Sequence, residues 1–467
     1  MSFASYEYLP FLLLVLLCYQ FVPARLRCLA LLLSSYAFYI WWEPWHGLLL
    51  LASTAVDYFV GLALGRSLST PIRRRLLWLS IVTNLAFLAT FKYVGFAVEI
   101  LEDLGGGSLA WPALVLPLGI SFYTFQSLSY TIDVYRRRCE PCTSPVTFGL
   151  YVSFFPQLIA GPIERADHLL PQLRELRETR VTDLIEGGQL LLWGLLKKWV
   201  LADRLLAEVW PRFSEPERQD PLTLLLAAAG MNVVLFLDFS AYTDMARGSA
   251  RFFGVQLVEN FRRPFVATSL SQVAGRWHMS LQRWIGDYLY SPLTKGGAGP
   301  VKLWTTNLIC MGLFGLWHGA GWTFVIWGVL GGVAISCEHT ALYLRRKAGK
   351  RGRPGPPPPV AWLVTQLLWS LFIALFFCPD LEFAGRYVAG LGNLRWPGAE
   401  VLRVFSLPLL LFFGLGLGFQ LLGERGVLQA AWSRAGAGAR VALLVVGVAV
   451  LIYFRLPAPE PFIYFQF

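Results

Sequence analysis

Long apolar runs separated by short charged segments dominate this chain, and they constrain its fold more than any other feature. A helix needs about 20 apolar residues to cross the hydrocarbon core of a bilayer, and runs approaching this length recur along the whole sequence. Hydrophobic residues make up 56% of the 467 residues and charged residues only 15%, against about 25% charged in soluble proteins. The sequence therefore predicts an all-α, polytopic integral membrane protein.

We expect about eleven or twelve membrane helices in one domain, residues 1–467, without a fused soluble domain or an internal repeat. Residues 146–163 contain Pro156, Gly161 and Pro162 and should form a broken or re-entrant segment, and residues 165–180 should form a loop. A basic, proline-rich linker is expected at 345–359. The apolar segments are 8–22, 29–42, 48–64, 76–100, 114–132, 184–209, 222–239, 301–317, 322–343, 362–377, 405–422 and 441–454.

Basic residues cluster after the first, third and fifth apolar segments, whereas the loops between these clusters lack them. The positive-inside rule then places the N-terminus outside and the clusters in the cytoplasm. Because such loops account for the net charge of +11, the charge does not indicate nucleic-acid binding. Residues 1–10 lack the basic stretch of a cleaved signal peptide, so the first apolar segment should be retained.

Two histidines, His278 and His318, lie between long apolar runs. An ionisable group in or near the membrane is costly and is a functional-site hypothesis by default. His278 begins a stretch with an apolar stripe at helical spacing, which predicts an amphipathic helix that lies at the membrane surface or re-enters partway. The stripe consists of Trp277, Leu281, Trp284, Ile285 and Tyr288. His318 is followed by Gly319 and Gly321, which let a backbone or ligand come close.

Several motifs point in one direction. They are 154–163 (FFPQLIAGPI), 238–246 (DFSAYTDMA), 259–261 (ENF), 276–278 (RWH), 287–290 (DYLY), 316–320 (LWHGA) and 462–467 (FIYFQF). Together they resemble the membrane-bound O-acyltransferase family, in its bacterial polysaccharide branch with alginate-type O-acetylation. This resemblance implies a central tunnel lined by re-entrant and amphipathic segments, with a catalytic core at 260–345.

The resemblance further implies that His318 is the catalytic histidine and His278 the second active-site residue. The chemistry agrees, because acyl transfer from a thioester to a hydroxyl requires a base near neutral pH and an imidazole supplies one. Trp277 and Trp317 would form walls that exclude water. We expect support from Arg276, Asp238, Asp244 and Tyr242.

Each of these residues also has a structural interpretation. A buried histidine is usually a hydrogen-bonded structural residue. Asp238 and Asp244 could hold substrate, although orienting a neighbouring arginine is the more ordinary role. His46, His168 and His339 are interpreted as structural, the first two in loops. The pair Cys139 and Cys142 has no second ligand pair at metal-binding spacing, so we expect no metal site.

A group of cations on the predicted cytoplasmic face could bind the phosphates of a donor, or could serve only to orient the protein. These are Arg262, Arg263, Arg283, Lys295 and Lys302. The resemblance implies acetyl-CoA as donor substrate, with no bound cofactor. It also implies a bacterial inner membrane location, a polysaccharide acceptor and an extracytoplasmic (periplasmic) acetyltransferase partner. D-alanyl transfer from a carrier protein, acylation of a lipid or protein, and transport without chemistry remain alternatives.

Overall fold

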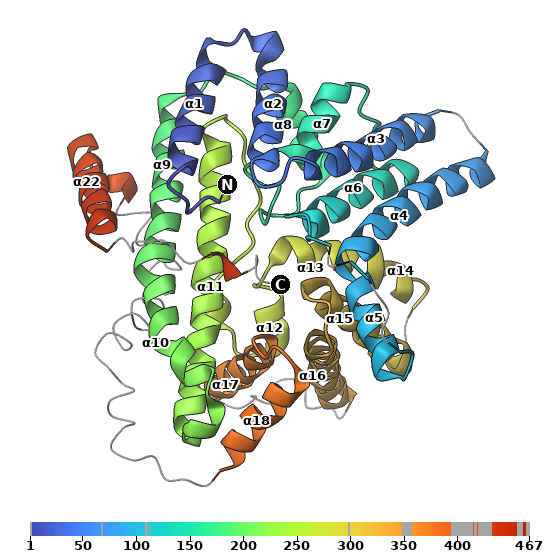
Figure 1. Ribbon diagram of the computed structural model, residues 1–467, viewed down its shortest axis with the longest axis vertical. Coiled ribbons are helices and arrows are strands. Elements are labelled where there is room, and N and C mark those ends of the chain that lie inside the picture. Colours follow the sequence, from blue (N-terminus) through green and yellow to red (C-terminus); the bar gives the residue numbers. More distant parts are fainter. Residues whose placement is uncertain are drawn as a thin grey trace. The chain divides into compact units, whose positions relative to one another are not determined.

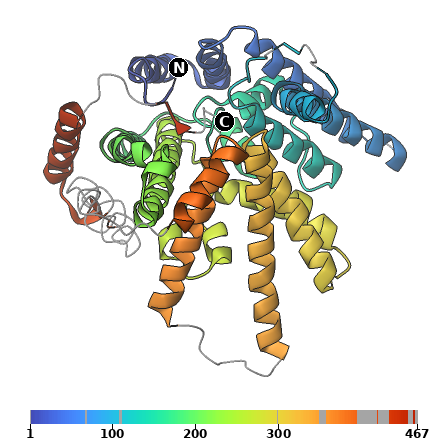
Figure 2. The ribbon, with the colours of Figure 1, turned by 60° about the horizontal axis from the view of Figure 1, so that its bottom comes forward.

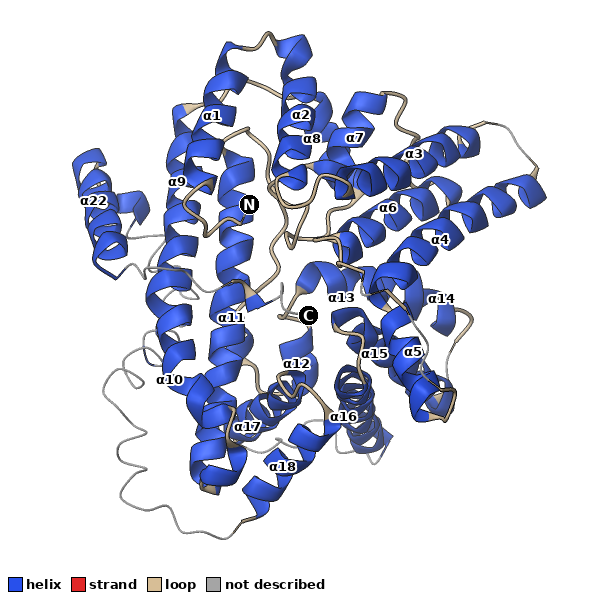
Figure 3. Ribbon diagram, in the orientation of Figure 1, coloured by secondary structure: helices blue, strands red, loops and turns tan. Residues whose placement is uncertain are grey.

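The computed structural model describes most of the chain. The described residues form helices, turns and loops without a strand, as the sequence predicts (Figure 3). Their ranges are 2–66, 69–107, 111–112, 114–297, 299–347, 357–393, 414, 418, 432–454 and 461–463.

The chain divides into two compact units. The first comprises Met1–Gly194 and Tyr242–Glu259, and the second comprises Leu195–Ala241 and Asn260–Phe467. Helix α11 (Pro221–Arg251) contributes residues to both. Both histidines of interest belong to the second unit.

The first unit consists of helices that pack through apolar faces and through one buried polar cluster. On α3, Asp57 accepts hydrogen bonds from Ser80 and Asn84 of α4 and from Thr131 of α6. Polar bonds of this kind hold membrane helices together because lipid offers no partner for the polar groups. The helices are α1 (Tyr8–Phe21), α2 (Arg27–Ile40), α3 (His46–Leu64), α4 (Thr70–Lys92), α5 (Val94–Asp103), α6 (Ile120–Tyr135), α7 (Pro145–Ser153), α8 (Ala166–Arg174) and α9 (Val181–Leu195) (Figure 1).

Some boundaries in this unit differ from the sequence prediction. The apolar run 76–100 is not one helix, because the chain breaks at Tyr93 between α4 and α5. The predicted loop 165–180 contains a helix, α8, whose apolar residues are buried. The prediction for 146–163 is confirmed: α7 ends at Ser153, and turns continue through the segment that holds Pro156.

The second unit contains the remaining helices. A π-helical segment (Leu196–Ala202) leads into α10, and a second one (Gly286–Tyr290) follows α13. Residues Pro264–Val266 form a single 3-10 turn. The helices are α10 (Asp203–Phe213), α12 (Leu270–Ala274), α13 (Met279–Ile285), α14 (Ser291–Thr294), α15 (Pro300–His318), α16 (Trp322–Lys347), α17 (Pro358–Phe376), α18 (Leu381–Gly392) and α22 (Ala437–Phe454).

Five of the described helices are long and apolar enough to cross a membrane: His46–Leu64, Thr70–Lys92, Pro221–Arg251, Trp322–Arg345 and Pro358–Phe376. The predicted segment 405–422 lies outside the described residues apart from two isolated positions. The total of eleven or twelve spans therefore stays a prediction, while the all-helical class is confirmed.

Helices α15 and α16 form a tight antiparallel hairpin, and α17 packs beside α16 (Figure 2). Glycines allow this approach: a Cβ added to Gly315 would lie 3.0 Å from the Cα of Gly328. Small residues at such crossings are typical of membrane helices, because their backbones gain packing contacts only when they come close. The hairpin places His318, the last residue of α15, against the first turns of α16.

Candidate active site

His318 ends α15 and is buried. Its Nδ1 donates a hydrogen bond to the carbonyl oxygen of Phe314, one turn earlier, at 2.7 Å. A carbonyl oxygen can only accept, so the proton is on Nδ1, and in the neutral ring Nε2 carries the lone pair. Aromatic rings surround the imidazole, with centroids at 4.4 Å for Phe314, 4.9 Å for Trp317 and 5.1 Å for Trp327. When this imidazole is neutral, its Nε2 can therefore accept a proton.

Gly319 follows His318 because no side chain fits there. A Cβ at this position would overlap the ring of Phe324. The backbone of Gly319 is extended, so the helix ends immediately after the histidine. The sequence analysis expected a backbone or a ligand to approach this glycine, and the structure places the Phe324 side chain there instead.

His278 is fully buried and has a left-handed backbone, with φ 45°. A non-glycine residue in this region is uncommon and strained, and such strain gathers at functional sites. Asn260 holds the turn: its carbonyl accepts from the N–H of Met279 at 2.8 Å, and its Oδ1 accepts from the Ser280 hydroxyl at 2.6 Å. A further backbone bond joins the N–H of Arg262 to the carbonyl of Arg276 at 2.9 Å.

The sequence prediction for this segment was wrong in one respect. Helix α13 begins at Met279, so Arg276, Trp277 and His278 precede it instead of sharing its stripe. Trp277 is nevertheless buried, as are Leu281 and Trp284. Asn260 was not singled out as a site residue, because a side chain that stabilises a turn 18 residues later leaves no periodic signal.

The two histidines come together. Their ring centroids are 6.3 Å apart, with the planes at 78°. The ring centroid of Trp317 lies 5.7 Å from that of His278 and 4.9 Å from that of His318, so Trp317 contacts both imidazoles. Its proposed role in excluding water stays a prediction. Phe239 of α11 meets His278 edge-on at 4.8 Å.

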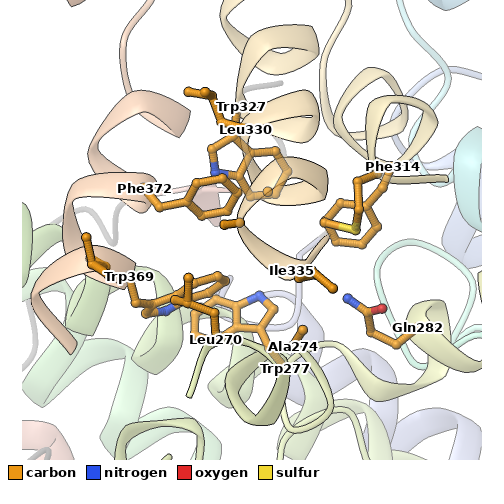
Figure 4. A pocket seen from close by; sticks show the side chains of 14 residues that line it. Leu270, Ala274, Trp277, Gln282, Phe314, Trp327, Leu330, Ile335, Trp369 and Phe372 are labelled. Atoms are coloured by element: carbon orange, nitrogen blue, oxygen red, sulfur yellow. The ribbon is translucent and has the colours of Figure 1, made fainter. Parts of the chain in front are cut away.

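A cavity of about 230 Å³ lies near this pair (Figure 4), and its lining includes Trp277, Phe314 and Trp327 but neither histidine. Its walls come from α12, α13, α15, α16 and α17, and they are almost entirely apolar. Trp327 and Phe372 lie on one side, with Trp277 on the other. Phe314 and Trp327 also contact His318, so these two rings lie between the cavity and the imidazole.

Two tryptophans of the lining carry buried donors. The indole Nε1 groups of Trp327 and Trp369 have no hydrogen-bond acceptor among the described residues. Buried polar groups are normally paired.

Asp238 pairs with a lysine instead of the arginine that the sequence led us to expect. Its Oδ1 lies 2.7 Å from Nζ of Lys198, and Lys198 also pairs with Asp203 at 2.8 Å. All three side chains are buried. Sequence reasoning missed Lys198 and Asp203, because nothing in the local pattern links Lys198 to a carboxylate 40 residues away.

Tyr242 and Asp244, also proposed as supporting residues, belong to the first unit. Tyr242 is buried and stacks on Phe3, with ring centroids 4.7 Å apart. Asp244 lies 3.7 Å from Arg247, so it does have an arginine neighbour. The catalytic contributions of both residues stay predictions.

The proposed donor-binding cations are mostly exposed. Arg262, Arg283, Lys295 and Lys302 are exposed, and Arg263 is half-buried, as is the supporting residue Arg276. Lys302 donates hydrogen bonds to the carbonyls of Lys295 and Gly297, both at 3.2 Å. Lys302 thus stabilises the turn before α15, and donor binding by this group stays a prediction.

The other histidines occupy helices. His46 and His168, expected in loops, begin α3 and lie in α8, and His339 is exposed on α16. The side chain of Glu164 accepts a 2.7 Å hydrogen bond from Nδ1 of His168, and this bond raises the pKa of His168.

Cys139 and Cys142 are both free thiols. Over the part of the chain that the structure describes, no group of three His, Cys, Asp or Glu side chains could hold a metal ion.

Comparison with known proteins gives this arrangement its context. Residues 141–378 match the model of MBOAT, the membrane-bound O-acyltransferase family, and this region holds both histidines, the Lys198 cluster and the cavity. The chain belongs to the membrane-bound O-acyltransferase family. It is therefore a multi-pass membrane protein with O-acyltransferase activity, as the sequence motifs indicated.

Three relatives of this chain are named for different acceptors. A probable alginate O-acetylase of Pseudomonas aeruginosa is 34% identical over 85% of this chain and 78% of its own length. A peptidoglycan O-acetyltransferase of Helicobacter pylori is 30% identical over 78% and 73%. A teichoic acid D-alanyltransferase of Bacillus subtilis is 26% identical over 48% and 60%.

Proposed function

We propose that this membrane-bound O-acyltransferase transfers an acetyl group from acetyl-CoA, bound at the cytoplasmic side, toward hydroxyls of an exported polysaccharide. Similarity to a probable alginate O-acetylase and to a peptidoglycan O-acetyltransferase supports the acetyl group and the polymer acceptor. The apolar cavity beside His318 suits the apolar part of a thioester donor, whose carbonyl oxygens could accept from Trp327 and Trp369. The exposed cations near α13–α15 suit its phosphates.

His318 acts as the base, and one observation carries this role. The hydrogen bond from Nδ1 to the Phe314 carbonyl leaves Nε2 with the lone pair. Nε2 takes the proton of the acceptor hydroxyl while its oxygen bonds to the thioester carbon. The carbonyl electrons move to oxygen, then return and expel the thiolate, which takes the proton from the imidazolium. The products are an ester and a free thiol.

His278 positions the reacting groups. At a centroid separation of 6.3 Å, the two rings are too far apart for a direct hydrogen bond, so an oxygen atom held by both would have to bond to each ring separately. His278 can therefore hold the hydroxyl or polarise the thioester carbonyl while His318 removes the proton. Burial away from water favours the neutral form of an imidazole, which is the form a base needs.

We further propose an inner membrane location, with the N-terminus outside and the donor side in the cytoplasm. A passage through the membrane and an extracytoplasmic acetyltransferase partner would complete the route to the polymer. The relatives also include a D-alanyltransferase, so a D-alanyl carrier thioester is the alternative donor.

The test compares two histidine variants of the purified protein. His318→Ala should lower the turnover of labelled acetyl-CoA by about 10²–10⁴-fold, the usual contribution of a general base. His339→Ala is the matched control, because it removes an exposed histidine of α16 and should leave turnover unchanged. Retained turnover in His318→Ala would contradict the role of this histidine. Turnover of a D-alanyl carrier thioester alone would assign the other donor, and the absence of any thioester cleavage would favour transport.

A further inference from the structure

Lys198 lies between two carboxylates in the interior of the second unit. It is only 1% exposed, and its Nζ lies 2.8 Å from Asp203 and 2.7 Å from Asp238. One ammonium group thus faces two carboxyl groups. Buried charges need a partner and additional hydrogen bonds to satisfy the remaining lone pairs. The second oxygen of Asp238 therefore needs a donor from elsewhere.

The C-terminal segment supplies that donor. The backbone N–H of Ile463 donates to Oδ2 of Asp238 at 2.9 Å. The Phe462 ring covers Nζ of Lys198 at 4.8 Å, and the Pro461 carbonyl accepts from the same ammonium at 3.3 Å. Phe462 and Ile463 are both buried. The chain therefore brings residues 461–463 into the interior and binds them to the ion cluster through three separate contacts.

The cluster adjoins the active site through a single peptide unit. Asp238 is followed by Phe239, whose ring meets His278 edge-on at 4.8 Å and 89°. Both residues lie within α11, a continuous helix, so a displacement of Asp238 displaces Phe239 as well. His278 depends on such neighbours because its backbone is held at a positive φ that it would not adopt alone.

We propose that residues 461–463 are a positioning element for His278. The Ile463 N–H and the Phe462 ring hold the Lys198–Asp238 pair in place, and Asp238 sets the position of Phe239 against the imidazole. Without the Ile463 donor, the buried carboxylate shifts or admits water, and the Phe239 ring moves with it. This inference rests on the proposed function, because its effect appears in acyl-transfer turnover.

The test removes one hydrogen-bond donor from the network. Ile463→Pro removes the N–H donor to Asp238, whereas the control Ile463→Val keeps it and loses one methylene. We expect Ile463→Pro to lower kcat for acetyl-CoA turnover by about 10- to 100-fold, since a misplacement of about 1 Å can cost about 100-fold. KM for the donor should change by less than about threefold, because the cations and the cavity are untouched. Wild-type kcat in folded Ile463→Pro would overturn the proposal.

A gentler variant covers the case in which Ile463→Pro does not accumulate in the membrane. Phe462→Leu keeps every backbone donor and removes the ring above Lys198, so kcat should fall by a smaller factor with KM unchanged. Unaltered kcat in this variant would then overturn the proposal.

A double-mutant cycle tests the route. If the segment acts through Phe239, the effects of Ile463→Pro (or Phe462→Leu) and Phe239→Leu on kcat must be non-additive. Additive effects would contradict the route through Phe239. An inactive wild-type protein would contradict the proposed function itself, whereas an active wild type with unaffected variants would contradict only this inference.

Discussion

Replacing Gly315 by alanine should separate the two helices that hold His318. A Cβ on Gly315 would lie 3.0 Å from the Cα of Gly328 and would overlap the carbonyl oxygen of Phe324. A backbone oxygen cannot rotate away as a side chain can. Restoring an ordinary C···O separation of about 3.3 Å therefore requires α15 and α16 to move apart by on the order of 1 Å. His318 and Trp327, whose rings are 5.1 Å apart, would separate with them.

The size of the effect follows from two opposing terms. Overpacking of a close interface costs about 1–3 kcal/mol, whereas alanine in place of glycine within a helix gains about 0.5–1 kcal/mol. At Gly315 the first term dominates, so we expect a net loss of folding stability. Gly312 is the matched control, one turn earlier on the same helix. A Cβ there would lie 3.7 Å from Val329, an ordinary contact, so Gly312→Ala should be as stable as the wild type or more stable.

The assay is thermal unfolding of the three proteins in one detergent, followed by acetyl-CoA turnover below the transition. Gly315→Ala should melt below wild type and turn over more slowly per folded molecule, because the misplaced His318 no longer reaches the acceptor hydroxyl. Gly312→Ala should match wild type in turnover. A Gly315→Ala protein that melts at or above the Gly312→Ala protein would refute the reasoning.

The remaining predictions concern the first unit. Asp57→Ala removes the carboxylate that accepts hydrogen bonds from Ser80, Asn84 and Thr131. At about 1–3 kcal/mol for each unsatisfied group, the melting temperature should fall clearly, and it should fall less in Asp57→Asn. Equal melting temperatures of Asp57→Ala and wild type would show that the cluster is not stabilising. The Glu164 hydrogen bond raises the pKa of His168, so this pair stabilises the fold below the unfolded-state pKa of about 6.5, and the stabilisation is lost as the pH rises through the folded-state pKa. His168→Gln should therefore flatten the pH dependence of melting above pH 6, and an unchanged dependence would contradict this linkage.

Local patterns were sufficient to locate the core of the site. Apolar run length predicted the helical class, and the family resemblance of the motifs around His278 and His318 implied that the two histidines share one site. Such patterns depend on residues that are close in the sequence, either within one helix turn or within one apolar run. The break of α4 at Tyr93 was missed because the nearby residue that weakens a helix, Gly95, lies two positions later and inside α5.

Tertiary pairing explains the main omissions. Asn260 stabilises the turn at His278, and Lys198 satisfies Asp238, in each case across a separation with no fixed spacing. An aspartate within an apolar run predicts that its carboxylate has a partner, but the sequence does not identify the cation that will lie near it. Lys198, and not an arginine, lies beside Asp238 because of how the π-helical segment 196–202 packs against α11. Sequence periodicity carries no information about that packing.

The positions of the two histidines depend on different parts of the fold. Distant substitutions should therefore affect one histidine more than the other. The protonation form of His318 is set within its own helix by the Phe314 carbonyl, so only changes that move α15 as a body should affect it. The orientation of His278 depends on Asn260, on Phe239 and, through Asp238, on residue 463. Substitutions far from the chemistry should therefore reduce turnover mainly through His278. The hydrogen bond that makes His318 a base should persist as long as α15 remains helical.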